Sequence, residues 1–109
     1  MAPKNILIKN GLLATSQNIS QADILISDGK ISKIGLLSNI DAEYTIDASN
    51  KYVLPGIIDP QVHFRDPGLT HKEDLKTGSM SAAAGGVTTF FEMPNTNPAT
   101  ITIEKLNEK

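Results

Sequence analysis

The sequence lacks cysteine altogether, and this absence excludes several classes of protein. Without cysteine the chain can hold neither a disulfide framework nor a zinc ribbon, and it has no thiol nucleophile. A cysteine-free composition fits a reducing compartment, so we expect a cytoplasmic protein. No apolar run approaches the roughly 18 residues that a membrane helix needs, so we expect no membrane partner.

Excess positive charge is also absent. Ten Lys and Arg face twelve Asp and Glu, which leaves a net charge of −2. A protein that binds nucleic acid through a strong basic field needs clustered positive charge, so we expect no nucleic-acid partner. Apolar residues make up 39% of the chain and charged residues 20%, a composition too apolar for a disordered tail. The 109 residues amount to about one small domain.

The first 54 residues alternate between apolar and polar positions as strands do. A first short run ends at Lys9 and Asn10. The pair Asp28-Gly29 lies between two apolar-rich runs and predicts a hairpin, because a type I′ turn needs positive φ at both central residues. Further short strands are expected at 44–47 and 51–54. The pattern predicts a small antiparallel β unit.

At Pro55-Gly56 the pattern changes to that of a parallel α/β protein. A short apolar strand at 57–59 runs into a polar loop, and Thr70 and Glu73 have the spacing of a capping box that begins a helix. Gly85-Gly86 ends that helix. The segment 87–92 is rich in β-branched and aromatic residues and predicts a strand buried on both faces; another helix starts within 100–109. The order is that of a βαβ unit.

Polar side chains follow both predicted strands, at the carboxyl ends where α/β proteins place functional groups. Gln61, His63 and Arg65 are spaced by two, so in an extended backbone they project to the same side, as metal ligands would. Asn95 follows the second strand. From the residues alone, His63 is either a metal ligand or a hydrogen-bonding loop residue. Arg65 is either a carboxylate fork or a surface ion-pair residue, and Asn95 is equally a turn residue.

Four stretches together resemble the opening of a dihydroorotase. The resemblance is in register over roughly residues 45–100. Hydantoinases and allantoinases share Pro-Gly-x-Ile-Asp but generally lack the His-x-Arg and Met-Pro-Asn-Thr pair that this chain carries. The four stretches are Val53–Asp59, His63–Asp74, Ala82–Thr89 and Met93–Pro98.

The resemblance implies a fold and a set of site residues. The fold would be α/β, the start of a (β/α)₈ metal-dependent hydrolase barrel at 55–109, preceded by part of a small β-sandwich domain at 1–54. His63 would match a metal-binding histidine for one or two zinc ions, and Arg65 and Asn95 would hold the carboxylate of the substrate. Gln61 stands where the family has another histidine, and its neutral amide oxygen is a poorer zinc ligand than imidazole. A barrel typically needs ~250 residues, so the stretch from residue 55 would supply two of eight units.

The resemblance also implies an activity, the reversible hydrolysis of dihydroorotate to N-carbamoyl-aspartate in pyrimidine biosynthesis. It would be carried by a full-length, homo-oligomeric parent. The catalytic residues would lie outside this chain, so we expect the 109 residues alone to be inactive. Two alternatives stay open: an inactive dihydroorotase-like scaffold for a transcarbamoylase partner, which Gln61 favours, and a hydrolase of another cyclic amide, of the allantoinase or hydantoinase type, which would have no use for Arg65.

Overall fold

The computed structural model describes residues 4–109. The chain divides into two compact units, Met1–Pro55 and Gly56–Lys109. Within the described range, no helix combines the length and the apolar character needed to cross a membrane.

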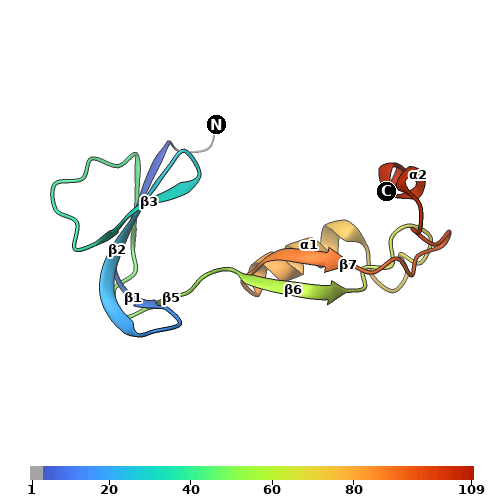
Figure 1. The fold of residues 1–109 in the computed structure, drawn as a ribbon, viewed down its shortest axis with the longest axis horizontal. Coiled ribbons are helices and arrows are strands. Elements are labelled where there is room, and N and C mark those ends of the chain that lie inside the picture. The colour runs from blue at the N-terminus through green and yellow to red at the C-terminus, as the bar shows by residue number, and fades with distance from the viewer. Residues whose placement is uncertain (1–3) are drawn as a thin grey trace. The chain divides into compact units, whose positions relative to one another are not determined.

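The first unit is a five-stranded sheet, and a long strand β1 lies at its centre (Figure 1). β1 pairs with β2 on one side, and β2 pairs in turn with β3 across the Asp28-Gly29 turn. Asp28 and Gly29 have φ of 50° and 75°, which confirms the predicted type I′ geometry. The core of this unit consists of Leu7, Ala22, Ile24, Leu25 and Ala48. The strands are β1 (Asn5–Ala14), β2 (Ile19–Ser27), β3 (Lys30–Gly35), β4 (Tyr44–Asp47) and β5 (Tyr52–Val53).

The prediction of a purely antiparallel unit is wrong. β1 and β2 are antiparallel, as are β2 and β3, but both β4 and β5 run parallel to β1. The chain between β3 and β4 is long enough to cross back to the start of β1, and a crossover of this kind gives parallel pairing. The length of the connection between β3 and β4, and not the apolar pattern of the strands, therefore decides that β4 runs parallel to β1.

The first strand also continues past the point where its apolar run stops. Asn10 has φ 62°, and the register of β1 on β2 shifts between Ile8 and Gly11, so the strand carries a bulge there. The backbone N–H of Asn10 donates to Asp23 Oδ1 at 2.8 Å, and Leu37 N–H donates to Oδ2 at 2.9 Å. The buried Asp23 carboxylate therefore satisfies the bulge and binds the segment after β3.

The second unit follows the predicted order of strand, helix, strand and helix (Figure 1). β6 (Ile57–Val62) and β7 (Val87–Glu92) form a parallel pair, and α1 (Leu75–Ala84) connects them and contacts β7. α2 (Ile103–Glu108) comes last. Because the strands are parallel, with Val62 opposite Glu92, their carboxyl ends lie at the same edge.

The helix α1 begins later than the predicted capping box. Asp74 is its N-cap, and the Asp74 carboxylate accepts the Thr77 N–H at 2.7 Å. Glu73 does not bond back to Thr70; its Oε1 accepts from Asp74 N–H at 3.0 Å and from the Thr77 hydroxyl. An aspartate is as good an N-cap as threonine, and a turn at 70–72 precedes it. Gly86, with φ 87°, ends the helix as predicted.

Neither β6 nor β7 is buried on both faces within this chain. Ile57 and Ile58 of β6 are 56% and 60% exposed, and Phe91 of β7 is 59% exposed. A two-stranded sheet with one covering helix leaves one face open to solvent, and burial on both faces requires further layers. Phe64 is the buried apolar residue of this unit, at 8% exposure.

Candidate functional site

The candidate site lies where β6 and β7 end. His63 follows β6 directly, and Asn95 lies in the loop after β7. The Met93 N–H donates to the Val62 carbonyl at 2.9 Å, which extends the parallel pairing to the last residues of both strands. The loops that leave the two strands therefore start side by side.

The structure brings two of the predicted site residues into contact. His63 Nδ1 lies 3.0 Å from Asn95 Oδ1. An amide oxygen only accepts hydrogen bonds, so the imidazole donates from Nδ1, and in the neutral ring the lone pair is then on Nε2. A carbonyl on the far nitrogen is the usual way in which a protein orients a metal-binding histidine. Asn95 in turn keeps both N–H bonds of its amide for another acceptor.

The backbone is not extended at Arg65, so the predicted alternation of Gln61, His63 and Arg65 does not continue to it. β6 ends at Val62, and Arg65 has φ 70°, which turns the chain out of the extended conformation. The Arg65 carbonyl accepts the Leu69 N–H at 3.0 Å, so the backbone closes a turn directly after it. The Arg65 side chain is half-buried. Gln61 stays exposed within the strand, and its N–H donates to Asp59 Oδ1 at 3.0 Å.

The two exit loops interlock behind these side chains. Gly68 has φ 86°, and a Cβ on it would lie 1.8 Å from the Asn97 carbonyl oxygen. The Asn97 N–H donates to the Pro67 carbonyl at 2.9 Å. Only glycine allows the loop that carries Arg65 to pass this close to the loop that carries Asn95. The sequence pattern predicts a polar loop here and does not reveal this contact.

Thr96, next to Asn95, fixes the second loop from inside. It is 8% exposed, and its hydroxyl lies 2.7 Å from the Pro98 carbonyl and 2.7 Å from the Thr100 hydroxyl. Its N–H donates to the Pro94 carbonyl at 2.9 Å. A buried, fully bonded threonine in a short loop is a sign of a preformed conformation. Sequence reasoning missed it because threonine is common in loops for many reasons.

The residues present supply part of a metal shell. Within residues 4–109 no three His, Cys, Asp or Glu side chains gather closely enough to hold an ion by themselves. His63, with its free Nε2 and its oriented ring, fits a single zinc ligand. Gln61 lies two residues before His63, within β6, and offers a neutral oxygen. The donor set thus fits zinc as one contributor among others.

Electrostatic effects around the site come from the helix that follows it. The Thr77 backbone N–H, donating to the Asp74 carboxylate, lowers the pKa of Asp74 below its ordinary value. The Asp66 carboxylate accepts from the Leu75 N–H at 3.4 Å. The second of these bonds ties the loop after His63 and Arg65 to the start of α1. A cavity of about 470 Å³ opens beside them, lined by Asp59, His63, Phe64, Glu73, Gly78 and Val87.

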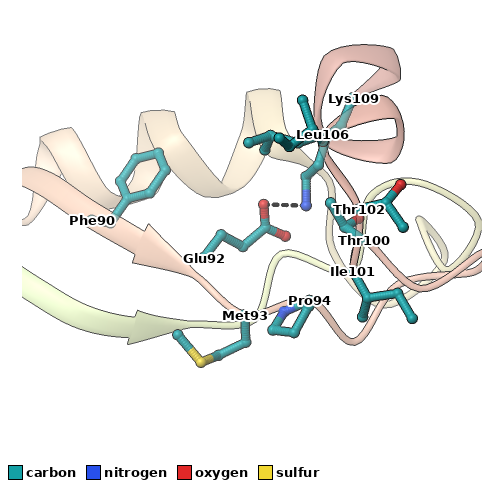
Figure 2. A pocket seen from close by; sticks show the side chains of 10 residues that line it. Phe90, Glu92, Met93, Pro94, Thr100, Ile101, Thr102, Leu106 and Lys109 are labelled. Carbon is teal, nitrogen blue, oxygen red and sulfur yellow. Dashed lines mark ion pairs between the residues drawn. The ribbon is translucent and has the colours of Figure 1, made fainter.

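A larger cavity of about 640 Å³ lies at the end of β7 against α2 (Figure 2). Glu92 and Lys109 form an ion pair at 2.5 Å across it, and both side chains are 10% exposed. Among the described residues Glu92 Oε1 has no hydrogen-bond partner. The lining includes neither His63 nor Asn95. This ion pair ties α2 back onto β7 and so limits the span of the loop that carries Asn95.

Comparison with known proteins places these features in a family. The family model described as dihydro-orotase-like matches residues 50–108. A dihydroorotase from Ligilactobacillus salivarius is 54% identical over 101 residues, covering 90% of this chain and 24% of that protein. A dihydroorotase from Streptococcus pyogenes is 50% identical over 105 residues, covering 94% of this chain and 25% of that protein. The chain thus spans about a quarter of the length of the curated relatives it matches.

Solved structures with the same fold are named as hydantoinases. The L-hydantoinase from Arthrobacter aurescens matches with a TM-score of 0.89 at 41% identity, over 94% of this chain and 23% of that one. A D-hydantoinase matches with a TM-score of 0.80 at 38% identity, over 95% of this chain and 23% of that one. The sheet-rich first half and the α/β second half therefore share their fold with the matched parts of these two hydantoinases.

Proposed function

The chain belongs to the dihydro-orotase-like family, and on that premise we propose that it is the amino-terminal quarter of a zinc-dependent dihydroorotase. In this proposal the first unit, 1–54, is part of a small β-sandwich domain. The second, 55–109, forms the first two β/α units of a (β/α)₈ barrel. The exposed faces of β6 and β7 support the barrel, because further strands would cover them.

The hydrogen bond between His63 and Asn95 is the observation that carries the proposal. It leaves His63 Nε2 free to bind zinc and leaves the Asn95 N–H groups free to donate to an anion. Dihydroorotate offers a carboxylate beside the ring amide that is to be hydrolysed. One asparagine thereby links the metal ligand to the group that identifies the substrate.

Arg65 supplies the charge for the same carboxylate in this proposal. Its guanidinium forms a fixed fork of donors that suits a carboxylate, and its half-buried position strengthens such a contact. The Gly68–Asn97 contact holds the loop of Arg65 against the loop of Asn95, which supports a ligand shared by the two loops. Zinc, when bound, supplies the Lewis acidity for hydrolysis of the ring amide. The described residues bind and orient the substrate.

The resemblance to hydantoinases supports a second candidate function, the hydrolysis of an uncharged cyclic ureide. The TM-score of 0.89 with the Arthrobacter aurescens L-hydantoinase is the specific observation in its favour. Arg65 favours dihydroorotate, because a neutral ring has no carboxylate for a guanidinium to bind. The proposal also includes a homo-oligomer and a cytoplasmic location, the latter in keeping with a cysteine-free sequence. A transcarbamoylase partner belongs to the alternative of an inactive scaffold.

The experiment measures zinc content and turnover in the full-length protein, in His63→Ala and in His71→Ala. His71 is the matched control, because it is the other histidine of the sequence and lies exposed in the turn before α1. We expect His63→Ala to lose zinc and His71→Ala to keep it, as measured by atomic absorption. Equal zinc content in all three proteins would refute the assignment of His63. Faster turnover of hydantoin than of dihydroorotate by the wild type would favour the second candidate.

A further inference from the structure

Gly78 lies in the interior of α1, where glycine is a poor choice. Glycine is the weakest helix former after proline, so a glycine in mid-helix usually has a packing reason. Gly78 is the buried residue of this helix. A Cβ added to it would lie 2.5 Å from Cδ1 and 2.6 Å from Cε1 of Phe64. The position therefore requires space for an aromatic ring and not a special backbone conformation.

Two other glycines of the chain show the contrast. Gly29 and Gly86 have φ of 75° and 87°, and a Cβ on either would meet nothing within 4 Å. Those two are required by the backbone, as turn and helix end. Gly78 is required by its neighbour, because α1 could not approach Phe64 with any side chain at this point.

The Phe64 ring is held on its other side by β7. Its centroid lies 4.8 Å from that of Phe90, and the ring planes meet at 81°, the edge-to-face arrangement that aromatic pairs favour. Phe64 is 8% exposed, whereas His63 before it is exposed. Because Phe64 contacts Gly78 on α1 and Phe90 on β7, its ring is packed in a single position. We call Phe64, Gly78 and Phe90 the ring clamp.

The ring clamp affects His63 because Phe64 is its direct neighbour in the chain. Phe64 stands between His63 and Arg65, and the backbone leaves the extended conformation at Arg65. A residue fixed at its side chain fixes the directions in which its two neighbours project. Within residues 4–109, the His63 side chain has a single hydrogen bond, the one to Asn95, and the packed neighbour next to it in the chain is Phe64.

We propose that Phe64, seated against Gly78, is a positioning residue that aims His63 at Asn95 and at the metal. The metal part of this inference rests on the proposed function. The hydrogen-bond part does not, because it concerns two residues whose contact is present without metal. The inference assigns Gly78 a role at the site although it lies on a helix and touches no substrate.

The experiment compares the full-length protein with Gly78→Ala, with the double variant Phe64→Leu, Gly78→Ala and with Gly85→Ala. Gly85 is the matched control: it ends the same helix, and a Cβ there would meet only carbonyl oxygens at 3.5 and 3.6 Å, ordinary contacts. Two readouts are taken. Proton–nitrogen NMR of the ¹⁵N-histidine-labelled, metal-free protein reports which ring nitrogen of His63 carries the proton, with His63→Gln identifying the signal. Competition with a chelator gives the zinc affinity.

We expect Gly78→Ala to reduce the Nδ1-protonated fraction of His63. We also expect it to weaken zinc binding about 10- to 100-fold, the usual effect of disturbing the support of a metal ligand. Phe64→Leu in the same chain makes room for the new methyl group and should bring zinc affinity back to within about threefold of the wild type. Gly85→Ala should leave both readouts unchanged. A helix weakened in general would respond alike to both glycine substitutions and would not be rescued by Phe64→Leu.

The opposite results overturn the inference. These are a His63 spectrum in Gly78→Ala that matches Gly85→Ala, or a double variant no better than Gly78→Ala. Should Gly78→Ala not fold, Phe64→Ala removes the ring without altering the helix, and an unchanged His63 spectrum in that variant refutes the ring clamp. A wild type that binds no zinc contradicts the proposed function alone, since the NMR comparison still decides the inference.

Discussion

The hydroxyl of Thr96 gives a sharp test of whether the loop after β7 must be preformed. Thr96→Val keeps the shape of the side chain and removes its hydroxyl. The hydroxyl donates to the Pro98 carbonyl and makes a second bond with the Thr100 hydroxyl, both at 2.7 Å. Valine leaves both of these groups without their buried partner.

The expected magnitude follows from those two bonds. A typical intramolecular hydrogen bond contributes about 0.5–1.5 kcal/mol net, so the pair is worth about 1–3 kcal/mol. Asn95 precedes Thr96 directly and holds the substrate in the proposed function, so we expect this loss to appear as weaker binding. At about 1.4 kcal/mol per tenfold, kcat/KM for dihydroorotate should fall between about 5-fold and 150-fold, mainly through KM.

The assay is steady-state turnover by the full-length protein, with thermal unfolding measured in parallel. Thr100→Val and the double variant complete a cycle, and the two substitutions should be non-additive by at least about 0.5 kcal/mol because they share one bond. Thr45→Val, on an exposed position of β4, is the control and should leave kcat/KM unchanged. A folded Thr96→Val protein with less than a twofold change in kcat/KM would refute the reasoning.

Two further predictions concern the charged groups. Arg65→Met should lower kcat/KM for dihydroorotate by ~30-fold or more, since losing a buried charge-assisted contact costs about 2–5 kcal/mol; steady-state assays check this, and a change below threefold would contradict the role. Asp23 has a pKa below its ordinary 3.8, because the Asn10 and Leu37 N–H groups donate to its carboxylate. Its stabilisation is therefore complete above that value and is lost as the pH falls through the lower, folded pKa. Asp23→Ala should thus lower the urea midpoint at neutral pH and flatten its decline in acid, whereas Asp41→Ala, on an exposed position, should do neither.

The features that the sequence predicted correctly depend on neighbours in the chain. The Asp28-Gly29 hairpin and the end of α1 at Gly86 need positive φ, a property of one or two residues. The order of strands and helices in the second unit follows from short apolar runs that predict strands and from the segment between them that predicts a helix. The pairing of β6 with β7 follows from the helix between them, because a helical crossover returns the chain in parallel.

The features that the sequence predicted wrongly depend on distant partners. β1 passes through Asn10 because the Asp23 carboxylate, 13 residues away, accepts its N–H. β4 and β5 lie parallel to β1 because of where the chain returns after β3. Local propensity favours Thr70 as the start of α1, but Asp74 makes the cap because its carboxylate reaches Thr77. In each case a contact between segments outweighs a local preference.

The difference between local and distant contacts also explains why the sequence predicts the residues of the candidate site but not their arrangement. His63 and Asn95 were expected at two strand ends, and parallel pairing brings strand ends together, so their contact at 3.0 Å follows from topology. The alternation of positions 61, 63 and 65 assumes an extended chain, and this assumption fails at Arg65, where φ is 70°. A left-handed residue rotates every later side chain away from the strand pattern. What aims the site is then the fit of Phe64 against Gly78 and of Gly68 against Asn97. Such fits are properties of pairs of residues that no periodicity connects, so they become visible only when the two segments are placed together.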